Sequence, residues 1–215
     1  MSVRPEFGPT LPSLLAARGV SRRAMAVALV VLAAVAVAVY VGAKSLSDDR
    51  QIVIDGPPQF NLVYDSSILH TVTPQAGELV RLVGNRRDVR VTITARAISV
   101  PAYGKGDFVG GELPVVGEQH LATLRAQYGP VQVYDEGKAR INRNPGWQIG
   151  FSAKAPQGAL FGRDAYVFPD EVGNTKGILL SMRRLILRHQ TAADGAFFKT
   201  VKLAFSSFNF GGSQP

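Results

Sequence analysis

The longest apolar segment of the chain lies near its start. Residues 24–43, AMAVALVVLAAVAVAVYVGA, form a run of 20 without a charged side chain. The run is apolar on all sides at helical spacing, so it lacks the polar face of an amphipathic surface helix. At about 1.5 Å per residue, such a helix spans the roughly 30 Å hydrocarbon core of a bilayer. The pattern predicts a transmembrane helix over residues 24–43, with a buried core helix as the alternative.

Charged residues on both sides of this run predict its orientation. They are Arg4, Glu6, Arg18, Arg22 and Arg23 before the run, and Lys44, Asp48, Asp49 and Arg50 after it. Arginine next to a membrane favours the cytoplasmic side, so we expect residues 1–23 to be a cytoplasmic arm and the remainder to be extracytoplasmic. Val41-Gly42-Ala43 resembles a signal-peptide cleavage site, but secretory apolar regions usually span about 7–15 residues. An uncleaved signal anchor is therefore favoured over a cleaved signal peptide.

Beyond a predicted linker over residues 44–58, apolar and polar residues alternate in short segments, which is typical of β-strands. The clearest segment is 89–98, where apolar residues at 89, 91, 93, 95 and 97 share one face and Arg or Thr residues occupy the other. Asp135-Glu136-Gly137 is predicted to be the turn of a hairpin. The predicted strands cover residues 52–54, 60–64, 78–83, 89–98, 131–134, 138–141, 147–153, 165–168 and 177–187.

Two segments with helical periodicity interrupt these strands. Residues 114–128 repeat apolar side chains at helical spacing, and Gly129-Pro130 ends the pattern. Residues 191–205 place three phenylalanines and a valine near one stripe. Because consecutive strands joined by short turns pair antiparallel, we expect an α+β fold, an antiparallel sheet with helices packed on it. This extracytoplasmic domain is predicted over residues 59–212, preceded by the single N-terminal transmembrane helix.

Two short motifs at the ends of this domain carry a family resemblance. The domain opens with Phe60-Asn61-Leu62-Val63-Tyr64-Asp65 and closes with a helix that leads into Phe205-Ser206-Ser207-Phe208-Asn209-Phe210. Over roughly residues 59–210 the chain resembles the PsbP/Mog1-like family of α/β/α sandwich domains, although Asp65 stands where that family usually has proline. The resemblance implies a non-enzymatic domain that docks onto a larger complex or helps its assembly, and it implies no catalytic residue.

Composition and charge exclude several classes of function. The 215 residues include no cysteine, which excludes a disulfide scaffold, cysteine catalysis and thiolate metal sites. The net charge of +8 divides into +3 for residues 1–50, with six Lys or Arg and three Asp or Glu, and +5 for the remainder, with 18 and 13. The basic residues of the domain are dispersed, whereas nucleic-acid-binding domains gather them on one face. We therefore expect no nucleic-acid partner.

No motif for catalysis or cofactor binding is complete. Gly150-Phe151-Ser152-Ala153-Lys154 lacks the second glycine of a nucleophile elbow. The glycine-rich stretch 103–111 follows a strand and precedes a helix, but its spacing is not the dinucleotide-binding fingerprint. If that stretch binds a ligand, Lys105 and the backbone amides near Gly110 are the candidate contacts. The three histidines, His70, His120 and His189, lie far apart in sequence. We therefore expect no catalytic residue, no metal ligand and no cofactor.

Aromatic and paired basic residues are the remaining candidates for an interaction surface. A helix with adjacent Phe197 and Phe198 cannot bury both side chains equally, so one of them is available to a partner or a pocket. The full set of candidate interaction residues is Phe197, Phe198, Trp147, Arg183, Arg184 and Lys105.

Two functions fit these observations. The first is a single-pass, membrane-anchored extracytoplasmic module of a bacterial envelope, non-catalytic, whose partners are the bilayer and another envelope protein or complex. Such a module predicts an exposed apolar or basic patch and no convergent polar pocket. The alternative is an envelope hydrolase acting on lipid or polysaccharide, which predicts a deep pocket with titratable groups of shifted pKa. The absence of a nucleophile or metal motif favours the first.

Overall fold

The computed structural model of the chain describes residues 26–27, 29–37, 49–101, 111–170, 175–188 and 193–211. The chain divides into two compact units, Met1–Ser47 and Asp48–Pro215. In the first unit, residues 26–27 and 29–37 are helical and exposed. Among the described residues, no helix has the length and apolar character needed to cross a bilayer. The predicted arm 1–23, and part of the predicted transmembrane segment 24–43, lie outside the described residues.

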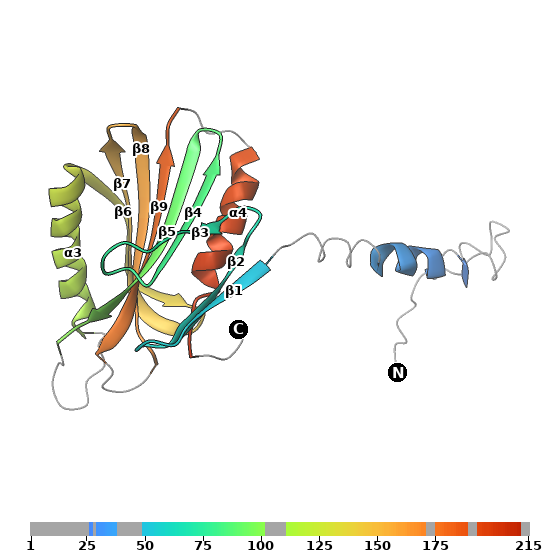
Figure 1. Ribbon diagram of the computed structural model, residues 1–215, viewed down its shortest axis with the longest axis horizontal. Helices are drawn as coiled ribbons and strands as arrows, with labels where there is room; N and C mark the ends of the chain where they lie inside the picture. Colours follow the sequence, from blue (N-terminus) through green and yellow to red (C-terminus); the bar gives the residue numbers. More distant parts are fainter. Residues whose placement is uncertain are drawn as a thin grey trace, which may run out of the picture. The chain divides into compact units, whose positions relative to one another are not determined.

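The described part of the second unit contains two antiparallel sheets and two helices (Figure 1). The large sheet has the strand order β3-β4-β5-β9-β8-β7-β6, and the small sheet has the order β1-β2-β10. The helices are α3 (Leu113–Tyr128) and α4 (Ala193–Ser206). The strands are β1 (Asp49–Ile54), β2 (Phe60–Asp65), β3 (His70–Thr71), β4 (Val80–Arg86), β5 (Val89–Ser99), β6 (Val131–Ile141), β7 (Asn144–Ala155), β8 (Gly158–Val167), β9 (Lys176–Ile186) and β10 (Asn209–Phe210).

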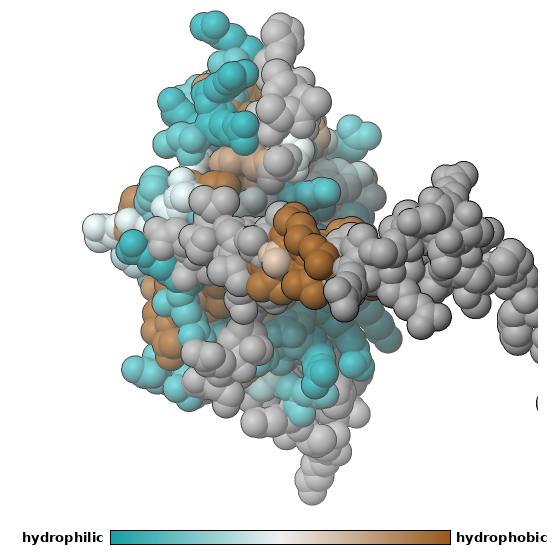
Figure 2. All heavy atoms as spheres, turned by 90° about the vertical axis from the view of Figure 1, so that its right-hand side faces the viewer, coloured by the Kyte–Doolittle hydropathy of each residue, from teal (hydrophilic) through white to brown (hydrophobic). Residues whose placement is uncertain are grey.

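The two helices cover opposite faces of the large sheet (Figure 1). On one face, α4 and the small sheet bury the main core, in which Phe60, Phe205 and Phe208 are almost fully enclosed. On the other face, Leu121 and Leu124 of α3 pack against apolar side chains of β7 and β8. The predicted α+β class, an antiparallel sheet with helices packed on it, is thus confirmed. On the side of the molecule shown in Figure 2, hydrophilic side chains occupy much of the visible described surface.

Strand β5 shows how the alternating pattern builds the core. Val89, Val91, Ile93 and Ala95 are all buried beneath α4 and the small sheet, as their spacing predicts. Ala97 lies on the same face of the strand by alternation, but it is exposed. The opposite side of β5 is mostly solvated, apart from Thr94, which is buried beside β9.

The predicted hairpin turn at Asp135-Glu136-Gly137 is wrong. Those residues lie inside β6, which runs from Val131 to Ile141 and pairs with β7 along that length. The chain reverses instead at Asn142 and Arg143, whose φ angles are +44° and +72°. Two consecutive residues with positive φ form the backbone of a type I′ turn, the usual two-residue link in hairpins. A charged Asp-Glu-Gly segment matched the composition of a turn, but its backbone groups complete the β6–β7 ladder.

Other boundaries shift at the edges of elements. Strand β1 lies within the segment 44–58 that the sequence predicts as a linker, and it pairs with β2 from Asp49↔Asp65 to Ile54↔Phe60. Strand β8 begins at Gly158, seven residues before the predicted start at Ala165. At both places pairing with a neighbouring strand extends the element, which local periodicity does not reveal.

Candidate functional site

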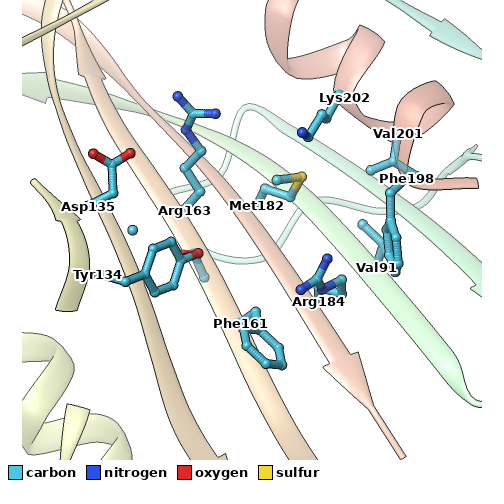
Figure 3. A pocket seen from close by; sticks show the side chains of 12 residues that line it. Val91, Tyr134, Asp135, Phe161, Arg163, Met182, Arg184, Phe198, Val201 and Lys202 are labelled. Carbon is cyan, nitrogen blue, oxygen red and sulfur yellow. The ribbon is translucent and has the colours of Figure 1, made fainter. Parts of the chain in front are cut away.

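A cavity lies on the α4 face of the large sheet, between α4 and strand β6 (Figure 3). It has a volume of about 240 Å³. Its lining combines cationic, aromatic and aliphatic side chains with one carboxylate. The lining residues are Val91, Tyr134, Asp135, Gly150, Phe161, Gly162, Arg163, Met182, Arg184, Phe198, Val201 and Lys202.

Strand alternation decides which arginines face this cavity. On β9, Arg184 lies on the α4 side, whereas its neighbour Arg183 lies on the α3 side and pairs with Asp164 there. On β8, Arg163 lies on the α4 side and Asp164 on the α3 side. Side chains of a strand point to alternate faces, so the two members of each pair, Arg183 with Arg184 and Arg163 with Asp164, lie on opposite faces of the sheet.

A β-bulge in β6 brings two successive side chains to the same cavity. The register between β6 and β7 shifts between Val133 and Asp135, which leaves Tyr134 as the extra residue. A bulge redirects side chains that would otherwise alternate between faces, so both Tyr134 and Asp135 line the cavity. The Tyr134 hydroxyl donates a hydrogen bond of 3.2 Å to the Gly162 carbonyl across the cavity edge. Burial raises the pKa of Tyr134, while Arg184 and Arg163 act in the opposite direction.

Arg184 is held by two aromatic rings. Its guanidinium carbon lies 4.6 Å from the centre of the Phe161 ring and 4.4 Å from that of the Phe198 ring. These are cation–π distances, and the two rings come from β8 and α4. None of the residues that the structure describes accepts a hydrogen bond from Arg184, and its buried Nε atom has no partner. Burial lowers the pKa of Arg184, since a desolvated cation is less stable than a solvated one.

Arg163 belongs to a chain of polar contacts at the β6 side of the cavity. It donates a hydrogen bond to the Gln148 side-chain oxygen, and the Gln148 amide nitrogen donates to Asp135 Oδ2 at 2.8 Å. Its guanidinium carbon also lies 5.4 Å from the centre of the Phe205 ring. The buried Nε atom of Arg163, like that of Arg184, has no partner among the described residues. The carboxylate of the cavity is thus already engaged, while both arginines keep unused donor groups.

The opposite face of the same strands contains a buried ion network beneath α3. Asp164 is fully buried and accepts hydrogen bonds from His120 Nε2 at 2.5 Å and from both terminal nitrogens of Arg183. The Arg183 guanidinium carbon also lies 4.9 Å from the centre of the Phe151 ring. Burial alone would raise the pKa of Asp164, but Arg183 and His120 outweigh it and lower that pKa to about 2. This network joins α3 to β8 and β9 and is closed off from the cavity by the sheet.

The structure brings together two of the six residues expected at an interaction surface. Phe198 and Arg184 meet at the cavity. Phe197 is buried in the main core, and Trp147 packs beneath α3 near Gly117. Arg183 forms an ion pair with Asp164 on the opposite face of the sheet, so it does not line the cavity with Arg184.

The sixth residue, Lys105, lies outside the described residues, as does His189. Of the two adjacent phenylalanines, Phe198 lines the cavity, whereas Phe197 is buried in the main core.

Sequence reasoning missed the cavity's other polar residues. The sequence pattern predicts a strand end at Tyr134 and a turn at Asp135, and Arg163 lies in the part of β8 that the alternation does not predict. Lys202 could have been found from the sequence, because it lies four residues after Phe198 on the predicted helix. Two residues four apart share a helix face, so Lys202 should point the same way as Phe198. The structure also differs from the expectation of a module without a convergent polar pocket.

The lining residues favour binding rather than covalent chemistry. Within the described part of the chain, the cavity lining includes no Ser, Thr, Cys or His. The described residues also contain no group of three or more His, Cys, Asp or Glu placed to hold a metal ion. Three cations with unused donor capacity, next to aromatic and aliphatic side chains, can bind an anion and exclude water around it.

Comparison with known proteins identifies the fold. No protein-family model and no curated protein matches the chain. Among solved structures, the chain is similar to PsbP (CyanoP) from Synechocystis, with a TM-score of 0.51 and 10% identity over 76% of this chain and 92% of that chain. It is also similar to LpqN of Mycobacterium tuberculosis, described as involved in cell envelope biogenesis, with a TM-score of 0.46 and 11% identity over 75% and 91%. The chain has a PsbP-like fold.

Proposed function

We propose that this chain is a membrane-anchored, extracytoplasmic binding module that docks onto a larger envelope complex and has no catalytic activity of its own. One observation carries the proposal. The uncharged run of residues 24–43 ends only a few residues before Asp48, where the compact PsbP-like unit begins. A bilayer-inserted run would hold the domain that follows it near the membrane, and arginines before such a run favour an extracytoplasmic domain.

Two further features support a binding role. The resemblance to PsbP/Mog1-like domains implies docking or assembly rather than turnover. The cavity beside α4 offers cations and aromatic rings, which bind ligands, and its described lining lacks a hydroxyl or thiol nucleophile other than the Tyr134 phenol. A phenol whose pKa is raised is a poor nucleophile at neutral pH.

Membrane anchoring is tested by fractionation of cells that express the full chain with a C-terminal tag. We expect the protein in the membrane pellet after an alkaline wash, and we expect protease added to spheroplasts to remove the tag. Replacing Val31 and Val35 together with arginine should move the protein to the soluble fraction, since each central arginine costs about 3 kcal/mol on insertion. Replacing the exposed Arg140 and Lys138 with glutamine is the control and should leave the protein in the pellet.

Four outcomes decide between the alternatives. Extraction of the wild-type chain by the alkaline wash would contradict the anchor, and a protease-resistant tag would contradict the orientation. An N-terminal epitope lost from the mature protein would show a cleaved signal peptide. The docking hypothesis would be wrong if cross-linked membranes yielded the chain without a partner and the purified protein turned over a lipid or glycan. That result would favour the hydrolase instead.

A further inference from the structure

We propose that the cavity between α4 and strands β6, β8 and β9 binds an anionic amphiphile, a molecule with a phosphate or carboxylate head and a short alkyl chain. The head contacts Arg184, Arg163 and Lys202, and the chain lies against Val91, Met182 and Val201. This inference goes beyond the proposed function, because it assigns a small-molecule site to the domain whether or not the domain docks onto a protein.

The first argument is the balance of charge in the cavity. Three cations line it together with a single carboxylate, Asp135, which already accepts a hydrogen bond of 2.8 Å from Gln148. Arg163 and Arg184 are partly buried, and a cation withdrawn from water without a paired anion is destabilised. The Nε atoms of Arg163 and Arg184 are buried and have no partner among the described residues. A bound anion would offset this unbalanced positive charge through the terminal N–H groups of the two arginines.

The second argument is the way Arg184 is oriented. Figure 3 shows its guanidinium between the side chains of Phe161 and Phe198, and the ring centres lie 4.6 and 4.4 Å from its central carbon. A guanidinium that stacks on an aromatic ring keeps its in-plane N–H groups available for hydrogen bonds. Those N–H groups form a fork that matches two oxygens of a phosphate or carboxylate. The aromatic contacts therefore hold the fork in a fixed position before a ligand arrives.

The third argument concerns the apolar part and the size of the ligand. Beside the cations, Val91, Met182 and Val201 form an aliphatic wall (Figure 3). A free inorganic anion has no apolar part to bury against these side chains, whereas an alkyl chain is stabilised by each CH₂ that it buries there. The volume of about 240 Å³ lies just below the usual range of about 300–1,000 Å³ for ligand pockets. It accommodates one head group and a short stretch of chain.

Calorimetric titration with three probes tests this site. The full chain is purified into nanodiscs of phosphatidylcholine, and empty nanodiscs are the blank for partitioning of the probe into lipid. We expect hexyl phosphate to bind saturably with one site per chain. Inorganic phosphate, which has the head alone, and hexanol, which has the chain alone, should each bind at least tenfold more weakly. Phosphate binding as tightly as hexyl phosphate would overturn the amphiphile and indicate a simple anion site.

Matched variants locate the binding. Arg184→Gln should weaken hexyl phosphate binding at least tenfold. Arg90→Gln, the same substitution at an exposed position on the opposite face of the sheet, should leave it unchanged. Lys202→Gln, at an exposed position of α4, should weaken binding severalfold and keeps the test valid if Arg184→Gln does not fold. Unchanged affinity in both cavity variants would overturn the proposal.

Discussion

His120 on α3 and Asp164 on β8 are joined by a hydrogen bond of 2.5 Å, although 44 residues separate them in sequence. Asp164 is fully buried, and Arg183 of β9 completes its coordination. The His120 ring also lies edge-on to Tyr166, with 5.4 Å between ring centres. One carboxylate therefore links a helix to two neighbouring strands, and it does so on the face opposite the candidate ligand cavity.

Replacing Asp164 with asparagine should strongly destabilise the domain. The substitution leaves the partly buried Arg183 without its counter-ion, and breaking a buried pair by removing one partner costs about 3–5 kcal/mol. Urea denaturation followed by the fluorescence of Trp147, the only tryptophan, measures the change in the free energy of unfolding. Glu118→Gln is the control, since Glu118 is exposed and 3.8 Å from Arg125, and exposed pairs contribute about 0–1 kcal/mol. Equal losses in the two variants would contradict a structural role for the buried network.

The same carboxylate predicts a specific dependence of stability on pH. In the folded state its pKa is about 2, below the ordinary value of 3.8. A lowered pKa stabilises the folded state fully above the ordinary pKa, and that contribution is lost as the pH falls through the folded value. We expect the wild type to lose about 2 kcal/mol of unfolding free energy between pH 4 and pH 2 through this group. Urea midpoints of Asp164→Asn across that range should fall less steeply, and parallel curves would contradict the prediction.

Glycine-to-alanine substitutions at two positions should have opposite effects. A Cβ added at Gly162 would lie 2.2 Å from Phe151 Cζ, in the tightly packed layer beneath α3, and overpacking of this kind costs about 1–3 kcal/mol. A Cβ added at Gly195 of α4 would meet nothing within 4 Å. There alanine should stabilise the helix by about 0.5–1 kcal/mol.

Urea denaturation of both variants checks this pair of predictions. Adding Phe151→Leu to Gly162→Ala should recover part of the loss, because the leucine is smaller than the ring it replaces. Strictly additive free-energy changes would show that the two side chains do not collide.

A glycine in place of Arg143, in the turn between β6 and β7, should stabilise the folded domain. Arg143 has a φ angle of +72°, a left-handed conformation that costs a residue with a Cβ about 1–2 kcal/mol. Arg143→Gly should therefore raise the free energy of unfolding by roughly 1 kcal/mol. Arg140→Gly, in the adjoining strand, removes the same side chain where φ is ordinary and should lower stability by about 0.5–1 kcal/mol. A gain at both positions would mean that loss of the arginine charge, rather than backbone strain, is responsible.

Local patterns predicted much of the architecture but little of the cavity. The alternation at 89–98 identified β5 and its buried face, and helical spacing identified α3 and α4 within about two residues. Phe198 and Arg184 were named as interaction candidates, but nothing in the sequence placed them together. Phe161 and Arg163 were missed because their strand begins with glycine, alanine and leucine rather than with a clear alternation. Its start becomes visible only when Gly158 to Val167 pair with β7 and β9.

The sequence by itself determined the properties that depend on neighbouring residues, namely the uncharged run at 24–43 and most of the strands and helices. These follow from a period of two in strands and 3.6 in helices, which is set by the backbone. Only the tertiary structure decided that Arg184 lies between Phe161 and Phe198, that the β6 bulge turns Tyr134 and Asp135 inwards, and that Asp164 meets His120. Such contacts depend on strand register and on helix placement, and both arise from many weak packing interactions between distant parts of the chain.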